Sequence, residues 1–140
     1  MKKLFSIFIL MCALISSTNT SLALSSYDKY GVKTGSYKKT STSINSYDKY
    51  GRKTGSYKKT TNGYNSYDKY GSKKGSLKKT TNGYNSYDKY GSKKGSLKKS
   101  TGGKVIKYDK YGVKTGSYKK ATGGKIIEYD KYGRKAGAYK

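Results

Sequence analysis

The chain has 140 residues, and its 32 Lys and Arg against seven Asp and Glu give a formal net charge of +25. It contains no His and a single Cys, so it lacks the usual ligands of a clustered zinc site and the bases that activate a nucleophile. This composition argues against an enzyme, a metalloprotein and a disulfide-stapled domain, and we expect no catalytic residue, metal or cofactor.

Residues 1–23 have the pattern of a secretory signal peptide. Two lysines precede an apolar stretch at residues 4–15, and Ser21 and Ala23 are the small residues that a signal peptidase reads. The apolar stretch is shorter than an ordinary membrane-spanning helix, although a retained membrane anchor is the alternative. We expect cleavage after Ala23, which removes Cys12. The product is then a secreted, periplasmic or cell-surface protein with no stable membrane insertion.

The rest of the chain is organised by a pentapeptide, Tyr-Asp-Lys-Tyr-Gly, that recurs unchanged at intervals of 20 or 21 residues. Its six copies begin at Tyr27, Tyr47, Tyr67, Tyr87, Tyr108 and Tyr129. A fixed period of this size indicates a repeat architecture with one supersecondary unit per copy. Aliphatic residues are few, which by composition favours disorder, but Tyr and Thr are good strand residues.

Each pentapeptide predicts a tight turn. In the first copy, Asp28 suits the first position of a type I turn, and its carboxylate can accept hydrogen bonds from the backbone ahead. Gly31 can take the left-handed conformation that ends a three-residue hairpin loop. We expect Lys29 and Tyr30 at the tip and Val32 opposite Asp28. A disordered tandem repeat without fixed turns is the alternative.

A second set of turn signals connects the copies. In the second copy a strand is expected from about residue 52 to residue 60, followed by Asn62-Gly63, and Asn82-Gly83 repeats this connector. The chain has no proline to interrupt a strand. The predicted fold class is all-β: six tandem β-hairpin units forming a meander or a solenoid-like stack, with partial disorder as the alternative.

The copies are predicted to differ in how well ordered they are. Residues 24–100 are predicted to form polar N-terminal repeats. Residues 101–140 are predicted to be better ordered, because Val105-Ile106 and Ile126-Ile127 place aliphatic pairs on the first strand of the last two copies.

Alternation assigns side chains to the two faces of each second strand. In the first copy Gly35, Tyr37 and Lys39 share one face, and Ser36 and Lys38 share the other. A strand glycine leaves room for a neighbouring aromatic ring, so we expect tyrosine rings and lysine stems to pack over the glycines.

The last copy, Gly-Lys-Ile-Ile-Glu-Tyr-Asp-Lys-Tyr-Gly-Arg at residues 124–134, resembles a YD repeat, the unit of bacterial Rhs-type proteins and of teneurins. The resemblance recurs in weaker form from residue 27 to residue 140, with the arginine present at Arg52 and Arg134. It implies β-hairpin repeats on a secreted or surface protein, sometimes in contact with carbohydrate. The period and the aromatic hairpins are also similar, less closely, to choline-binding repeats, although this chain has no tryptophan.

Basic residues interleaved with aromatic ones carry the functional prediction. Lysine pairs recur in register and, in a stacked meander, would form a basic ladder that attracts polyanions. Tyrosine rings beside it could stack on sugars or bases. The predicted ligand-binding residues are the pairs Lys38 and Lys39, Lys58 and Lys59, Lys78 and Lys79, Lys98 and Lys99, and Lys119 and Lys120, with Tyr37, Tyr57 and Tyr118.

The predicted partner is an anionic polymer of the envelope or matrix: polysaccharide, lipopolysaccharide, teichoic acid or extracellular DNA. The alternative from a different class is a structural, self-associating surface or matrix protein, in which tyrosine-rich strands pair between chains. A charged surface that only keeps a tyrosine-rich β protein soluble is a simpler explanation. Solubility, however, requires far less charge than this chain carries.

Overall fold

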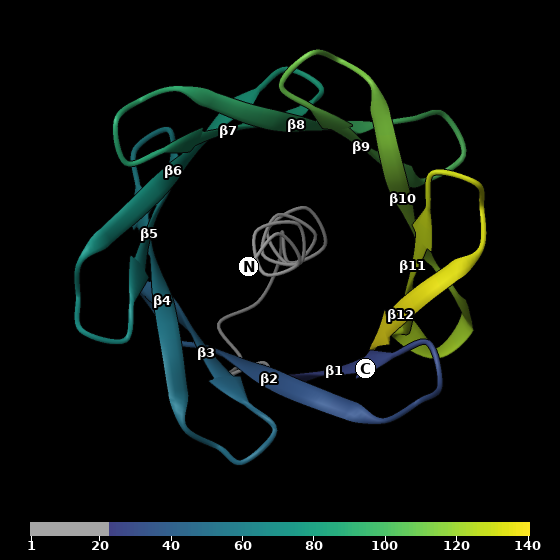
Figure 1. Cartoon of the computed structure of the whole chain (residues 1–140), viewed down its shortest axis with the longest axis horizontal. Coiled ribbons are helices and arrows are strands. Elements are labelled where there is room, and N and C mark those ends of the chain that lie inside the picture. The colour runs from purple at the N-terminus through teal and green to yellow at the C-terminus, as the bar shows by residue number, and fades with distance from the viewer. Residues whose placement is uncertain (1–22) are drawn as a thin grey trace.

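The computed structural model describes residues 23–140, and this part of the chain is all-β, as predicted. All of the predicted signal peptide except Ala23, and therefore Cys12, lies outside the described residues. Twelve antiparallel strands follow one another as hairpins, with one short 3-10 turn, η1 (Thr122–Gly124), before the last hairpin (Figure 1). The strands are β1 (Ala23–Asp28), β2 (Lys33–Lys39), β3 (Ser43–Asp48), β4 (Lys53–Thr60), β5 (Gly63–Asp68), β6 (Lys73–Thr80), β7 (Gly83–Asp88), β8 (Lys93–Lys99), β9 (Lys104–Asp109), β10 (Lys114–Lys120), β11 (Ile126–Asp130) and β12 (Lys135–Tyr139).

The predicted pentapeptide turn is confirmed. The Asp28 carboxylate accepts hydrogen bonds from the backbone nitrogens of Tyr30 and Val32, both at 2.9 Å. The Gly31 nitrogen donates to the Asp28 carbonyl at 3.2 Å, and Gly31 has a φ of 87°. The Asp28 nitrogen donates to the Val32 carbonyl, so these two residues close the loop. The aspartate and glycine at the same positions of the other five copies make the same backbone contacts.

Strands β1 and β12 pair with each other, so the sheet closes into a barrel (Figure 1). Ser26 lies opposite Tyr139, and the backbones of Ser25 and Lys140 exchange two hydrogen bonds of 2.6 and 3.0 Å. The prediction of an open meander or a solenoid-like stack is therefore wrong. Closure satisfies the backbone groups that two exposed edge strands would otherwise leave unpaired.

A bulge in each hairpin provides the curvature for this closure. In the first hairpin Ser26 pairs with Gly35 and Tyr27 pairs with Lys33, so Thr34 is an extra residue in β2. The same shift occurs in the other five hairpins that contain the pentapeptide. A bulge bends its strand and increases the local twist. Six evenly spaced bends curl the sheet until its first and last strands meet.

The inward face of the barrel carries a belt of six residue pairs, four of them serine with glycine, which we call the serine–glycine belt. The sequence had suggested that these glycines make room for tyrosine rings, and this prediction is wrong. A Cβ atom at Gly35 would lie 2.4 Å from the backbone carbonyl oxygen of Tyr47, so glycine here permits the close approach of two backbones. The belt pairs each residue that precedes a Tyr-Asp with the glycine opposite it: Ser26 with Gly35, Ser46 with Gly55, Ser66 with Gly75, Ser86 with Gly95, Lys107 with Gly116, and Glu128 with Gly137.

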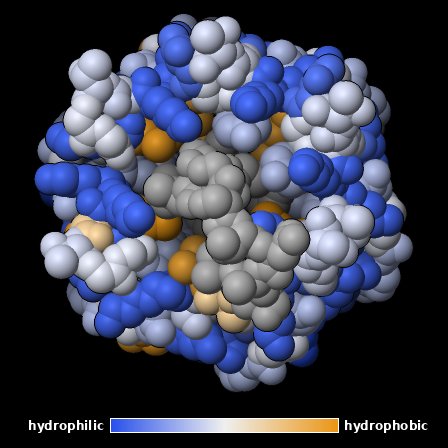
Figure 2. Space-filling view, turned by 180° about the vertical axis from the view of Figure 1, so that it is seen from behind, coloured by the Kyte–Doolittle hydropathy of each residue, from blue (hydrophilic) through white to orange (hydrophobic). Residues whose placement is uncertain are grey.

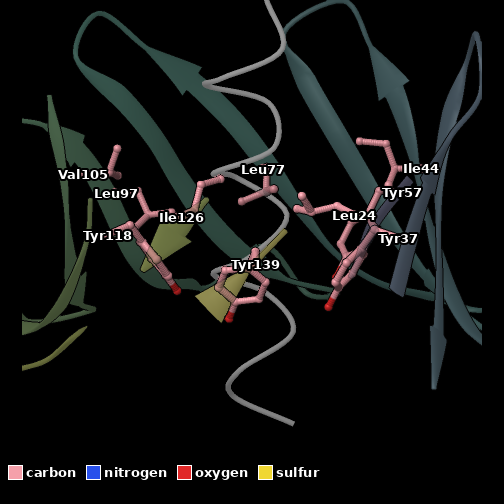
Figure 3. Packing of buried hydrophobic residues seen from close by; sticks show 10 residues of the cluster. All are labelled: Leu24, Tyr37, Ile44, Tyr57, Leu77, Leu97, Val105, Tyr118, Ile126 and Tyr139. Atoms are coloured by element: carbon pink, nitrogen blue, oxygen red, sulfur yellow. The ribbon is translucent and has the colours of Figure 1, made fainter. Parts of the chain in front are cut away.

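The buried apolar cluster lies on the same inward face. Its side chains project from around the wall, and the hydroxyl groups of Tyr37, Tyr118 and Tyr139 point toward one end of the barrel (Figure 3). On the face that Figure 2 shows, hydrophilic residues form the outer rim and apolar residues lie nearer the centre. The cluster consists of Leu24, Tyr37, Ile44, Tyr57, Leu77, Leu97, Val105, Tyr118, Ile126 and Tyr139.

The predicted boundary between residues 24–100 and 101–140 falls within one continuous sheet. Strand β8 pairs with β9 across it, from Gly95 opposite Asp109 to Lys99 opposite Val105. The two segments therefore share one barrel wall.

Candidate polyanion-binding surface

The barrel separates the two lysines of each predicted pair. Lys38 lies on the outer face, opposite Ala23 on one side and Asn45 on the other. Lys39 shares a face with Tyr37 and lies opposite Ile44, a residue of the buried cluster. The pleat places successive side chains on opposite faces, so the single basic ladder that the sequence suggested is divided into two rings.

Strand register places the first lysine of each pair in an outer ring and the second lysine in an inner ring. The first lysine of each pair is exposed on the outer wall: Lys38, Lys58, Lys78, Lys98 and Lys119. The second lysine lies opposite an inward-facing residue at the end of the barrel away from the pentapeptide turns: Lys39, Lys59, Lys79, Lys99 and Lys120.

Four outer lysines lie over tyrosine rings of the next strand. The rings belong to the first tyrosine of the pentapeptide, which is half-buried on the outer wall. A cation held over an aromatic face in this range is attracted by the ring quadrupole. The distances from Nζ to the ring centroid are 5.7 Å for Lys38 and Tyr47, 5.2 Å for Lys58 and Tyr67, 5.2 Å for Lys78 and Tyr87, and 5.5 Å for Lys98 and Tyr108.

The three tyrosines predicted to bind ligand lie elsewhere. Tyr37, Tyr57 and Tyr118 are 4%, 5% and 0% exposed and belong to the buried cluster. They share the inward face with the belt glycines, so they cannot stack on a polymer that runs along the outer lysines. Closure of the barrel makes their face the interior.

A second set of aromatic and basic side chains lies at one end of the barrel, at the tips of the pentapeptide turns, and we call it the crown. All six pentapeptide turns connect an odd-numbered strand to the following even-numbered one, so they lie at the same end. The lysine at each tip lies 4.7 or 4.8 Å from the ring of the tyrosine that follows it. The tip tyrosines are 70–81% exposed: Tyr30, Tyr50, Tyr70, Tyr90, Tyr111 and Tyr132. The turn tips were predicted from the sequence, but their lysines and tyrosines lie outside the predicted set of ligand-binding residues.

The turn aspartates are structural acceptors. Two of them also form ion pairs, Asp48 with Arg52 at 2.7 Å and Asp130 with Arg134 at 2.8 Å. Desolvation opposes ionisation of Asp48, but hydrogen bonds from the Arg52 backbone and guanidinium outweigh it. Together with the Tyr50 amide they hold the pKa of that carboxyl below its ordinary value. The same contacts from Arg134 lower the pKa of Asp130.

One buried acid stands apart from the turns. Glu128 is 6% exposed, and its two carboxylate oxygens accept hydrogen bonds from the hydroxyls of Tyr118 at 3.1 Å and Tyr139 at 2.8 Å. The Lys107 ammonium lies 3.2 Å from the same carboxylate. Burial, reinforced by the Glu128 charge, raises the pKa of Tyr37 to about 12 and also raises the pKa of Tyr139.

The sequence reading missed this cluster, although a signal was present. The residue before the Tyr-Asp pair is serine in four copies and becomes Lys107 and Glu128 in the last two. Opposite charges at the same position of consecutive hairpins predict a pair of neighbours on one face.

Comparison with family models, with characterised proteins and with solved structures finds no match to this chain. Among residues 23–140, no three His, Cys, Asp or Glu side chains gather closely enough to hold a metal ion. No helix in the described part of the chain has the length and apolar character needed to cross a membrane.

Proposed function

We propose that this protein is exported and binds anionic polymers of the envelope or matrix through the outer wall of its barrel. The ring of outer lysines carries the proposal, because it repeats at one register around the wall and each of four lysines is held over a tyrosine ring. A polymer with regularly spaced charges can neutralise several of these lysines at once and release its counterions.

The crown of exposed tip tyrosines supports the same function. Each tip presents an aromatic ring beside an ammonium group at the solvent. Such rings can stack on sugars or bases, while the neighbouring cations hold the charged backbone. The polymer classes that fit are acidic polysaccharide, lipopolysaccharide, teichoic acid and extracellular DNA.

The salt dependence of binding tests this proposal. Affinity for a long DNA duplex or for polygalacturonate should fall steeply as salt rises, since each neutralised charge contributes to the slope. The double variant Lys58→Gln/Lys78→Gln removes two outer lysines and should lower the slope for DNA by roughly two units. Its matched control is Lys59→Gln/Lys79→Gln, which removes the same charge from the inward positions of the same pairs.

Equal losses in the two double variants would contradict the assignment to the outer wall. Binding that is indifferent to salt would remove the polyanion function altogether.

The alternative is a self-associating structural protein. The seam between β1 and β12 favours it, because this junction has three paired positions whereas the junction between β4 and β5 has six. A seam that opened would expose two strands able to pair with other copies. Fibre formation in the absence of any polyanion would favour this alternative.

A further inference from the structure

A cavity of about 970 Å³ opens inside the barrel on the side of strands β3 to β10. Twelve strands enclose a wider interior than the eight whose side chains just fill a barrel. The cavity is lined by the belt serines Ser46, Ser66 and Ser86, and at its other end it reaches Lys107, the ion-pair partner of Glu128. Its size is within the range of small-molecule sites, about 300–1,000 Å³.

The cavity contains an unsatisfied polar group. Ser66 is 6% exposed, and its hydroxyl is the buried side-chain oxygen that has no hydrogen-bond partner among residues 23–140. In the first two hairpins the bulge residue supplies that partner, since Thr34 donates to Ser26 at 3.0 Å and Thr54 donates to Ser46 at 2.9 Å. In the third hairpin the bulge residue is a lysine. A buried hydroxyl without a partner is costly, and a ligand that bonded to it would remove that cost.

Two lysines are specific to this part of the wall. Lys74 and Lys94 occupy the bulge positions of the third and fourth hairpins and line the cavity. The other four hairpins have Thr34, Thr54, Thr115 and Ala136 at this position. Lys74 and Lys94 therefore stand at the position from which threonine bonds to the belt serine in the first two hairpins.

The rim adds hydrogen-bond acceptors. Asp68 and Asp88 line the cavity and each hold their turn through one carboxylate oxygen. Their second oxygen faces no arginine, because serine stands where Arg52 pairs with Asp48. Leu97 and the ring of Tyr57 supply apolar walls.

We propose that this cavity binds a short acidic saccharide, at a site separate from the outer wall. The Lys74 and Lys94 ammonium groups bind its carboxylates, and the Ser66 hydroxyl donates a hydrogen bond to a sugar oxygen. The free oxygens of Asp68 and Asp88 accept from sugar hydroxyls, and the apolar walls cover the faces of the rings. A neutral saccharide lacks the groups that the two lysines require.

Calorimetric titration with trigalacturonate tests the site, and neutral maltotriose is the ligand control. Ser66→Ala should weaken trigalacturonate binding about two- to tenfold, as loss of one hydrogen bond predicts. Lys74→Thr should weaken it about tenfold or more, because it removes a charged donor and gives Ser66 the partner found in other hairpins. Lys73→Thr is the matched control, since Lys73 lies next in sequence but pairs with Tyr67 on the outer face and should leave binding unchanged.

The site is overturned if maltotriose binds as tightly as trigalacturonate, if Lys73→Thr weakens binding as much as Lys74→Thr, or if Ser66→Ala has no effect. The same titration separates this site from the outer wall. Lys58→Gln/Lys78→Gln should weaken binding of long polyanions and leave trigalacturonate binding intact. Equal loss of both ligands in that variant would mean that the trisaccharide binds the outer wall, which contradicts a site in the cavity.

Discussion

Serine precedes the Tyr-Asp pair in four copies, and single substitutions at that position create the chemistry of the interior. Where the other copies have a serine hydroxyl, Lys107 and Glu128 form a part-buried ion pair, and Glu128 also accepts hydrogen bonds from two tyrosine hydroxyls. The sequence itself shows that these two copies have a charged residue where the other four have serine. The sequence does not predict that the two side chains meet inside the barrel, because the alternation of side chains along a strand does not say which face becomes the interior.

The buried tyrosines make the protein sensitive to alkali. Below pH 10 the Tyr37 hydroxyl is protonated in both the folded and the unfolded chain. Between pH 10 and about 12 the unfolded chain releases this proton first, because the folded pKa is raised to about 12 by burial and by Glu128. The free energy of unfolding should therefore fall across this window by about 2–3 kcal/mol from Tyr37 alone.

Urea unfolding at pH 9.5, 11 and 12 measures this loss. Tyr37→Phe should reduce the fall, and Tyr30→Phe, at an exposed turn tip, is the matched control. An unfolding free energy with the same pH dependence in both variants would show that Tyr37 is not the group responsible.

At the scale of the element, the hairpin is what the sequence predicts best. The Asp28 carboxylate and Gly31 determine the turn from within five residues, so no distant contact is needed to infer it. The prediction that Gly35 shares the face of Tyr37 is confirmed. The prediction that this glycine makes room for an aromatic ring is wrong. The close contact is with the backbone carbonyl of the next strand, and that distance depends on the bulge and the curvature.

The two kinds of glycine should therefore respond differently to alanine. Gly75→Ala would place a Cβ atom 2.3 Å from the Tyr87 carbonyl oxygen, so two strands must separate. Gly71→Ala meets nothing within 4 Å and strains only a turn with a φ of 87°, which should cost about 1–2 kcal/mol. Thermal unfolding should show the larger loss for Gly75→Ala. A greater loss for Gly71→Ala would indicate that the strands do not approach as described.

Closure of the barrel determines which lysines lie on its outer face and which lie on its inner face. The sequence correctly placed Lys38 and Lys39 on different faces of a strand, yet a stacked meander leaves both faces available to one ligand. Once β1 pairs with β12, one face becomes an outer wall and the other becomes a lumen. This pairing joins residues more than 100 positions apart and depends on accumulated twist, for which the local turn signals give no indication.

A disulfide across the seam tests this closure most directly. Ser25 and Lys140 exchange two backbone hydrogen bonds, and directly opposed residues of this kind have Cα atoms about 5.5 Å apart, within the range that a disulfide spans. In a chain cleaved after Ala23, as we propose, Cys12 is gone, and Ser25→Cys/Lys140→Cys should form an intramolecular disulfide on mild oxidation. Ser25→Cys/Val113→Cys should not, because Val113 lies in the turn between β9 and β10. Monomers cross-linked within one chain in the first variant alone are the predicted result. Free thiols, or disulfides only between chains, would contradict the closed barrel and favour an open, self-associating sheet.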